Sequence, residues 1–248
     1  MSKNFELLQK METRQTLPSQ EAVEPAFLLP RENGSGSGRR HWVEDGALRL
    51  VQQVFLLQTE EAPRMVVFAG IDHGNGCSRI ALSVAETLAG NARGAVCLVE
   101  ANFHSPALPA MLGTTNHHGL TDALLREGPI RSFAKPVLND NLWLLSSGSL
   151  AADSPNLLSS ERLKARSAEL RKEFEFVIVD APPLTRYADA IALGQLSDGI
   201  VLVLEANSTR REAALAAAEG LRSSGVRIVG AVLNKRTFPI PEKIYRRL

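Results

Sequence analysis

Short apolar runs alternate along this chain with segments whose apolar residues recur at helical spacing. The runs, which are typical of buried strands, cover residues 65–69, 95–99, 141–145, 176–179, 200–204 and 226–232. The helical spacing covers residues 43–57, 78–88, 163–174, 188–196 and 209–221. Strands that are apolar on both faces are typical of parallel sheets. The pattern therefore predicts an α/β fold, with a mostly parallel sheet and helices on both of its faces.

The last predicted helix carries a recognisable start signal. Thr209 precedes Glu212 by three residues, which is the spacing of a capping box. We therefore expect a capped, alanine-rich helix over residues 209–221.

Residues 1–40 lack this alternation. They are rich in Glu, Gln, Ser and Pro and end in alternating glycine and serine at residues 34–38, a composition typical of flexible linkers. The apolar residues 27–29 could dock on another surface, although we expect them to be solvated. The sequence predicts a flexible tail over residues 1–40 and one folded domain over residues 41–248.

The composition narrows the class of protein. Hydrophobic residues make up 44% and charged residues 22%, and the longest apolar runs are far shorter than the roughly 20 residues of a membrane span. A formal charge of +1 gives no general attraction to nucleic acid. Cys77 and Cys97 provide no disulfide framework, which fits a reducing compartment. We expect a cytoplasmic protein that does not bind nucleic acid.

A glycine-rich turn lies between the strand at 65–69 and the helix at 78–88. Backbone N–H groups of such a turn, together with the helix N-terminus, form an anion site. Glycines allow the backbone conformations and the close approach that this site needs. The turn therefore indicates a phosphate loop (P-loop) for a nucleotide, although an ordinary tight turn is the alternative. Its phosphate-binding residues would be Gly74, Asn75, Gly76, Cys77, Ser78 and Arg79.

Cys77 occupies the position at which a standard P-loop has its lysine. A neutral thiol cannot neutralise phosphate charge, and a thiolate would repel it. Arg79 or His73 could supply a substitute charge, but one residue along a helix turns a side chain by about 100°. We therefore expect ATP or ADP to bind through backbone groups, and phosphoryl transfer to suffer.

Two acids end predicted strands, at the positions where ligands of parallel sheets bind. Asp180 follows the strand at 176–179 and could hold Mg²⁺ opposite the Ser78 hydroxyl, or it could cap the turn that follows. Glu100 follows the strand at 95–99 and could position water or contact the metal. We predict Ser78 and Asp180 as the metal-binding pair.

Two asparagines also follow strands. Asn102 could orient a nucleophile, which gives a candidate catalytic set of Asp180, Asn102 and Glu100, although Glu100 and Asn102 could equally be plain strand-end residues. Asn234 follows the last strand and could pair with the edge of adenine, or it could be a turn asparagine.

Together these residues resemble the cytoplasmic domain of bacterial tyrosine autokinases, the capsular and exopolysaccharide regulators among the deviant P-loop ATPases. The resemblance covers about residues 41–248. It rests on the glycine-rich turn, on the strand ends at 99–102 and 233–236, and on the blocks at 119–124 and 157–183. It implies a parallel-sheet fold, Mg-ATP binding, and a transmembrane polysaccharide co-polymerase as partner. It also implies autophosphorylation of C-terminal tyrosines between neighbours in a ring.

The chain departs from this family at several functional positions. Cys77 replaces the loop lysine, and Glu100 and Asn102 stand where the family has two aspartates. In the family's assembly motif Glu44 is kept, whereas Ala47 and Leu50 occupy the arginine positions. The tyrosine cluster shrinks to one candidate phosphoacceptor, Tyr245.

These departures lead to a primary hypothesis and two alternatives. The first is a cytoplasmic nucleotide-binding regulator of exopolysaccharide or capsule synthesis and export, with weak or lost catalysis. The co-polymerase would recruit it to the inner face of the membrane, where it would form a homo-oligomer. The main alternative is an active ATP-dependent autokinase that phosphorylates Tyr245. A positioning ATPase is a further alternative, although Asp72 stands where those proteins carry an additional lysine.

Overall fold

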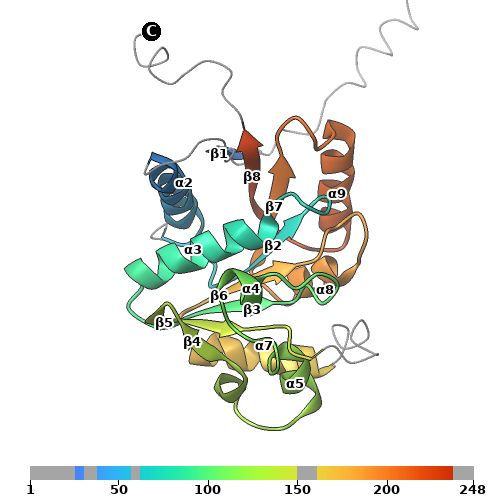
Figure 1. Ribbon diagram of the computed structural model, residues 1–248. Helices are drawn as coiled ribbons and strands as arrows, with labels where there is room; N and C mark the ends of the chain where they lie inside the picture. The colour runs from blue at the N-terminus through green and yellow to red at the C-terminus, as the bar shows by residue number, and fades with distance from the viewer. Residues whose placement is uncertain (1–25, 31–37, 57–61, 150–160, 237–248) are drawn as a thin grey trace, which may run out of the picture.

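The structure, a computed structural model, describes residues 26–30, 38–56, 62–149 and 161–236. These residues contain one eight-stranded sheet in the order β1-β8-β7-β2-β6-β3-β5-β4 (Figure 1). Only the pair of β4 and β5 is antiparallel among the described strand pairs. The strands are β1 (Ala26–Pro30), β2 (Met65–Gly70), β3 (Val96–Glu100), β4 (Lys135–Val137), β5 (Asn139–Leu145), β6 (Phe176–Ala181), β7 (Gly199–Glu205) and β8 (Ile228–Arg236).

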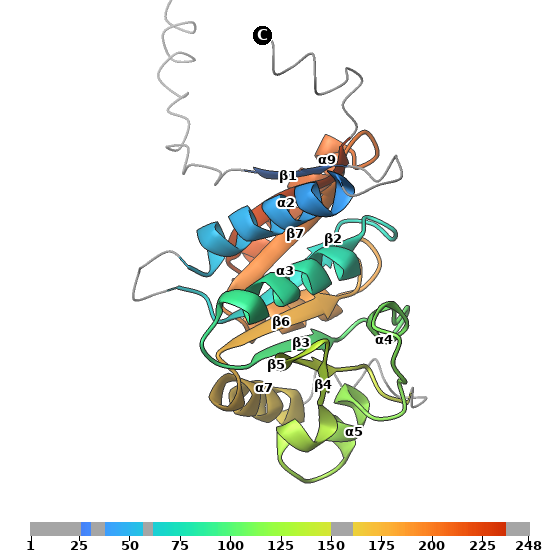
Figure 2. The ribbon, with the colours of Figure 1, turned by 60° about the vertical axis from the view of Figure 1, so that its left-hand side comes forward.

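Helices cover both faces of the sheet. The helices are α2 (Gly38–Val54), α3 (Cys77–Asn91), α4 (Leu108–Met111), α5 (Leu120–Leu125), α7 (Glu161–Glu173), α8 (Asp189–Gln195) and α9 (Arg211–Ser223), with a 3₁₀ turn at Ile130–Phe133. Figure 2 shows α2 and α3 in front of the sheet, whereas side chains of α7, α8 and α9 belong to the core cluster on its opposite face. The mostly parallel α/β fold predicted from the sequence is confirmed.

The central strands explain why their sequences are apolar throughout. In β2, Val66 and Phe68 join the core cluster under α2 and α3, whereas Val67 and Ala69 join the cluster on the opposite face. All four side chains are fully buried. Successive side chains of a strand point to opposite faces, so a strand covered on both sides can expose neither.

The structure differs from the sequence prediction at several elements. Ala26–Pro30, inside the predicted tail, pairs with β8 as edge strand β1. The rest of that segment up to residue 37 lies outside the described residues, and the domain boundary stays a prediction. Strand β4, which has only three residues and contains Pro136, was not predicted.

The predicted capping box is wrong. Helix α9 begins at Arg211, and its N-cap residue, Arg210, makes no side-chain cap bond. The Thr209 hydroxyl instead accepts a hydrogen bond from the Glu205 N–H at 2.8 Å. Thr209 therefore ties the end of β7 to the turn before α9.

Within the described part of the chain, no helix combines the length and the apolar character needed to span a membrane.

Candidate functional site

The predicted phosphate loop connects β2 to α3. Gly74 and Gly76 have φ angles of 84° and 83°, in the left-handed region that side chains other than glycine rarely adopt. A Cβ at position 76 would lie 2.4 Å from Nδ2 of Asn234, which is too close for any side chain. Both glycines are therefore required by the geometry of this turn.

The side chains of Asn75 and Asn234 stabilise the loop. The Asp72 N–H donates to Oδ1 of Asn75 at 2.7 Å, which closes the turn on itself. Nδ2 of Asn234, on β8, donates to the backbone oxygen of Asn75 at 2.8 Å. The amide group expected to pair with adenine is thus bonded to the loop, and its contact with adenine stays a prediction.

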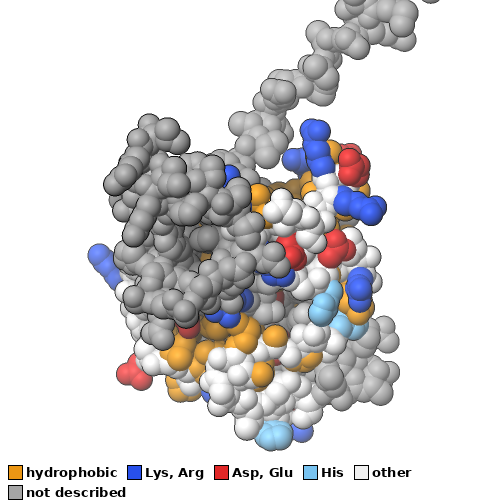
Figure 3. Space-filling view, turned by 45° about the horizontal axis from the view of Figure 1, so that its top comes forward, with side chains coloured by type: hydrophobic (Ala, Val, Ile, Leu, Met, Phe, Trp, Pro, Cys, Tyr) orange, Lys and Arg blue, Asp and Glu red, His pale blue; other side chains and the backbone are white. Residues whose placement is uncertain are grey.

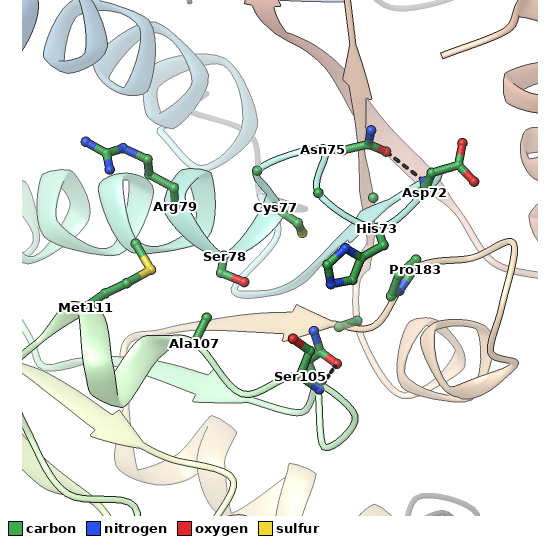
Figure 4. A pocket seen from close by; sticks show the side chains of 15 residues that line it. Asp72, His73, Asn75, Cys77, Ser78, Arg79, Ser105, Ala107, Met111 and Pro183 are labelled. Carbon is green, nitrogen blue, oxygen red and sulfur yellow. Dashed lines mark hydrogen bonds between the residues drawn. The ribbon is translucent and has the colours of Figure 1, made fainter. Parts of the chain in front are cut away.

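A cavity of about 380 Å³ opens in front of the loop (Figure 4). Its walls come from the loop and the first turn of α3, from the segment between β3 and α4, and from the end of β6. The lining residues are Gly70, Asp72, His73, Gly74, Asn75, Gly76, Cys77, Ser78, Arg79, Asn102, Ser105, Ala107, Met111, Ala181 and Pro183. All six predicted phosphate-loop residues and Asn102 are therefore brought together, whereas Glu100, Asp180 and Asn234 do not line the cavity.

Asp180 lies at the end of β6 with no exposed surface. Neither of its carboxylate oxygens has a hydrogen-bond partner in the described part of the protein. Burial raises the pKa of Asp180 to about 7; the adjacent Ser78 hydroxyl and Cys77 thiol oppose this rise, and Glu100 adds to it. Buried polar oxygens without partners are rare and call for an explanation. A divalent cation would supply one, because Mg²⁺ binds carboxylate and hydroxyl oxygens.

Glu100 ends β3 and is also fully buried. Its Oε1 accepts the backbone N–H groups of Ala107 at 2.5 Å and of Leu108 at 2.7 Å, which fixes the start of α4. Its Oε2 has no partner among the residues described here. Burial raises the pKa of Glu100, and these N–H groups together with Ser147 oppose the rise. The residue therefore anchors one wall of the cavity and keeps one oxygen available.

Asn102 and Arg79 differ in what they can offer a ligand. Oδ1 of Asn102 accepts the Ser105 N–H at 3.2 Å, so its amide oxygen shapes the loop after β3. Figure 4 shows the Arg79 side chain directed away from Ser78, as the 100° turn per residue on a helix predicts. Arg79 contributes to the cavity lining without facing the centre of the loop.

Cys77 remains uncharged in this setting. Burial raises the pKa of its thiol well above the ordinary range, and the neighbouring Asp180 carboxylate raises it further. A backbone bond to Gly70 opposes the rise without reversing its direction. The position that carries a lysine in a standard P-loop therefore holds a neutral side chain.

Sequence reasoning missed two residues of this site. Nζ of Lys235 donates to the backbone oxygen of Gly74 at 2.6 Å and pairs with Oε2 of Glu205 at 3.0 Å. Both residues stand at the ends of strands, and this position was the signal in the sequence that could have marked them as site residues. Nothing in their spacing showed that they would contact the loop.

A sequence relative decides the family. Tyrosine-protein kinase YwqD of Bacillus subtilis (strain 168) is 31% identical over 161 residues, which are 65% of this chain and 68% of that protein. The chain belongs to the bacterial tyrosine-protein kinase family. Tyrosine-protein kinase wzc of Salmonella typhimurium is 27% identical over 159 residues, 64% of this chain but only 21% of that protein. This chain thus corresponds to about a fifth of that longer relative. No protein-family model matches the chain.

Solved structures agree with the kinase family in fold. The chimerical protein CapA2B2 superposes with a TM-score of 0.73 at 18% identity, covering 86% of this chain and 95% of that one. The septum site-determining protein MinD from Pyrococcus horikoshii, complexed with Mg-ADP, has a TM-score of 0.58 at 17% identity, covering 74% of this chain and 76% of that one. These neighbours show the P-loop NTPase-like fold.

Two residues of α2 that replace arginines in the resemblance described above are buried. Ala47 and Leu50 are 2% and 0% exposed and belong to the core side of α2. The candidate phosphoacceptor Tyr245 lies outside the described residues.

Proposed function

We propose that this chain is a nucleotide-binding regulator of exopolysaccharide or capsule synthesis whose phosphoryl-transfer activity is weak or lost. The single observation that supports this most is the neutral Cys77, held between the phosphate loop and Asp180. A loop of suitable shape without a central positive charge can bind phosphate through its backbone. It is poorly suited to stabilise a phosphoryl group in transfer, because that step depends on positive charge at the phosphates.

Binding of ATP or ADP would use the glycine-rich loop and the N-terminus of α3. The left-handed Gly74 and Gly76 shape the loop, and helix N-termini favour negatively charged groups. Ser78 and Asp180 would hold Mg²⁺, because the buried Asp180 oxygens lack partners and lie next to the Ser78 hydroxyl. The ion would supply the charge that neutralises phosphate oxygens.

Catalysis is limited by the residues expected to assist it. Asn102 carries an amide that cannot accept a proton at neutral pH, and its oxygen is bonded to the Ser105 N–H. Glu100 is buried and uses one oxygen to hold the start of α4. Neither residue can act as an exposed general base for an incoming hydroxyl group.

Calorimetric titration with ADP and ATP, with and without Mg²⁺, tests binding. We expect magnesium-dependent binding by the wild type and a weaker magnesium effect in Ser78→Ala. Ser83→Ala, on the same helix and away from the loop, is the matched control. Equal Mg²⁺ dependence in Ser78→Ala and the wild type would remove Ser78 from the metal site.

An active tyrosine autokinase is the second candidate, because the chain belongs to the tyrosine-kinase family. It predicts phosphate on Tyr245 after incubation with Mg-ATP and the activating partner. The chain has two tyrosines, so Tyr187→Phe is the natural control for Tyr245→Phe. An unchanged mass of the C-terminal peptide, measured by mass spectrometry, would reject this candidate.

The proposed partner is a transmembrane polysaccharide co-polymerase, which would recruit the chain to the inner face of the membrane as a homo-oligomer. A nucleotide-binding domain over residues 41–248, with residues 26–30 of the predicted tail joined to its sheet as β1, suits this role. On the face shown in Figure 3, Lys and Arg side chains lie among Asp and Glu side chains. Co-purification with the co-polymerase, against vesicles and DNA as controls, tests the partner.

A further inference from the structure

Strand β8 contains a bulge where it passes behind the phosphate loop. Leu28 of β1 pairs with Leu233, whereas Pro30 pairs with Arg236, so one residue of β1 opposes Asn234 and Lys235. Lys235 has a φ angle of 56°, in the left-handed region. A lysine in this region costs roughly 1–3 kcal/mol, and such conformations persist where the surrounding structure requires them.

The bulge allows two consecutive side chains to reach the same loop. In a regular strand they would point to opposite faces of the sheet. Here Asn234 donates to the backbone oxygen of Asn75, and Lys235 donates to the backbone oxygen of Gly74. Bulges beside functional sites commonly redirect side chains in this way. Two consecutive loop carbonyls are therefore bound by two consecutive residues of β8.

These contacts come from residues outside the ligand cavity. Neither Asn234 nor Lys235 lines the cavity. Nζ of Lys235 forms an ion pair with Oε2 of Glu205 at 3.0 Å. Nδ2 of Asn75 donates to the same oxygen at 3.4 Å. Lys235 therefore does not replace the missing phosphate-facing charge. It holds the Gly74 carbonyl oxygen, which would repel an anion, against β8.

We propose that Lys235 is a positioning residue for the nucleotide. From the β8 bulge it holds the phosphate loop in its anion-binding shape, so that the loop keeps this shape with an uncharged residue at position 77. The effect on affinity rests on the proposed nucleotide binding, whereas the effect on the loop itself does not.

Amide hydrogen exchange of the nucleotide-free, full-length chain tests this proposal. We compare the wild type with Lys235→Met, with the conservative Lys235→Arg, and with Lys164→Met as a control on the exposed side of α7. In Lys235→Met we expect exchange over residues 72–78 to rise about tenfold, the factor that loss of one charged hydrogen bond implies, while β2 and β6 stay protected. Lys235→Arg should restore most of the protection, and Lys164→Met should match the wild type.

A parallel ADP titration separates the two proposals. We expect affinity to fall about tenfold in Lys235→Met and to recover in Lys235→Arg. Faster loop exchange in a protein whose wild type binds no nucleotide would support the role of Lys235 and contradict the proposed function. Unchanged exchange over residues 72–78, or an equal rise throughout β2 and β6, would overturn the proposal for Lys235.

Discussion

Glu100 and Asp180 are register partners across β3 and β6, and both side chains are fully buried. Three of their four carboxylate oxygens have no hydrogen-bond partner in the part of the chain that is described. Two buried carboxylates side by side cannot both be charged without a compensating cation, because each destabilises the ionised form of the other. This pair is therefore the point at which protons or Mg²⁺ should affect the fold most strongly.

Stability should fall as the pH rises through neutrality. The folded-state pKa of Asp180 is about 7, against roughly 3.9 for an unfolded aspartate. The folded state thus holds a proton that the unfolded state has released, and this contribution is full below about pH 4 and lost as the pH approaches and passes 7. We expect urea unfolding to show a free energy lower by a few kcal/mol at pH 8 than at pH 5.

Asp180→Asn should flatten this pH dependence, and Mg²⁺ should raise stability at pH 8 in the wild type alone. Asp140→Asn, an exposed position, provides the control. A wild-type unfolding free energy that does not decrease between pH 5 and pH 8 would be incompatible with a buried, protonated Asp180.

Gly76→Ala should abolish most nucleotide affinity. A Cβ there meets Nδ2 of Asn234 and removes its bond to Asn75, in addition to the strain of a positive φ angle. Gly225→Ala has a similar φ of 73° but no atom within 4 Å of the added Cβ. Both variants should lose roughly 1 kcal/mol of stability from backbone strain.

Calorimetry should show at least about tenfold weaker ADP binding for Gly76→Ala, as the loss of a hydrogen bond in the loop implies, and unchanged binding for Gly225→Ala. Equal ADP affinity in the two variants would show that the close contact with Asn234 does not matter.

Cys77 should resist alkylation in the native protein. Its raised thiol pKa leaves little thiolate at pH 7.5, and the thiolate is the reactive form. Burial raises the pKa of Cys97 as well, so Cys97 should react with iodoacetamide only after unfolding, and the partly exposed Cys77 should react slowly before it. Mass spectrometry of native and unfolded samples measures this; rapid native labelling of Cys77 would contradict the neutral thiol.

Glu100→Asp should destabilise the protein more than Glu100→Gln. A side chain shorter by one methylene loses its contacts with the N–H groups of Ala107 and Leu108, and an unsatisfied buried donor costs about 1–3 kcal/mol. Glutamine has the same side-chain length as glutamate and keeps an acceptor oxygen that can reach the same N–H groups. Urea unfolding measures the free energy of unfolding of both variants. A lower value for Glu100→Gln than for Glu100→Asp would show that charge, rather than side-chain length, matters at this position.

The fold and the phosphate loop were predictable because they follow from local signals. Continuous apolar runs such as β2 require burial on both faces, and the glycines after β2 mark a turn with positive φ angles. Parallel strands end at one edge of a sheet, and for this reason the sequence predicts both Asp180 and Glu100 as site residues. That they are direct register partners depends on strand order, and no local pattern in the sequence gives that order.

The contact of Lys235 with the loop was not predictable for a different reason. The alternation of side chains along a strand places Asn234 and Lys235 on opposite faces, and only the bulge opposite β1 brings them together. Residues 26–30 were expected to belong to a solvated tail. The capping-box prediction at Thr209 failed for a local reason, because its hydroxyl accepts the N–H of Glu205, four residues earlier.

The most direct test of the central claim measures ADP binding and ATP turnover by the wild type, with Cys77→Lys beside it. We predict that the wild type binds ADP and ATP with Mg²⁺ but releases no phosphate above background. Cys77→Lys should bind ATP more tightly because it restores a positive charge in the loop. Sustained ATP turnover by the wild type, or no nucleotide binding by either protein, would contradict the account.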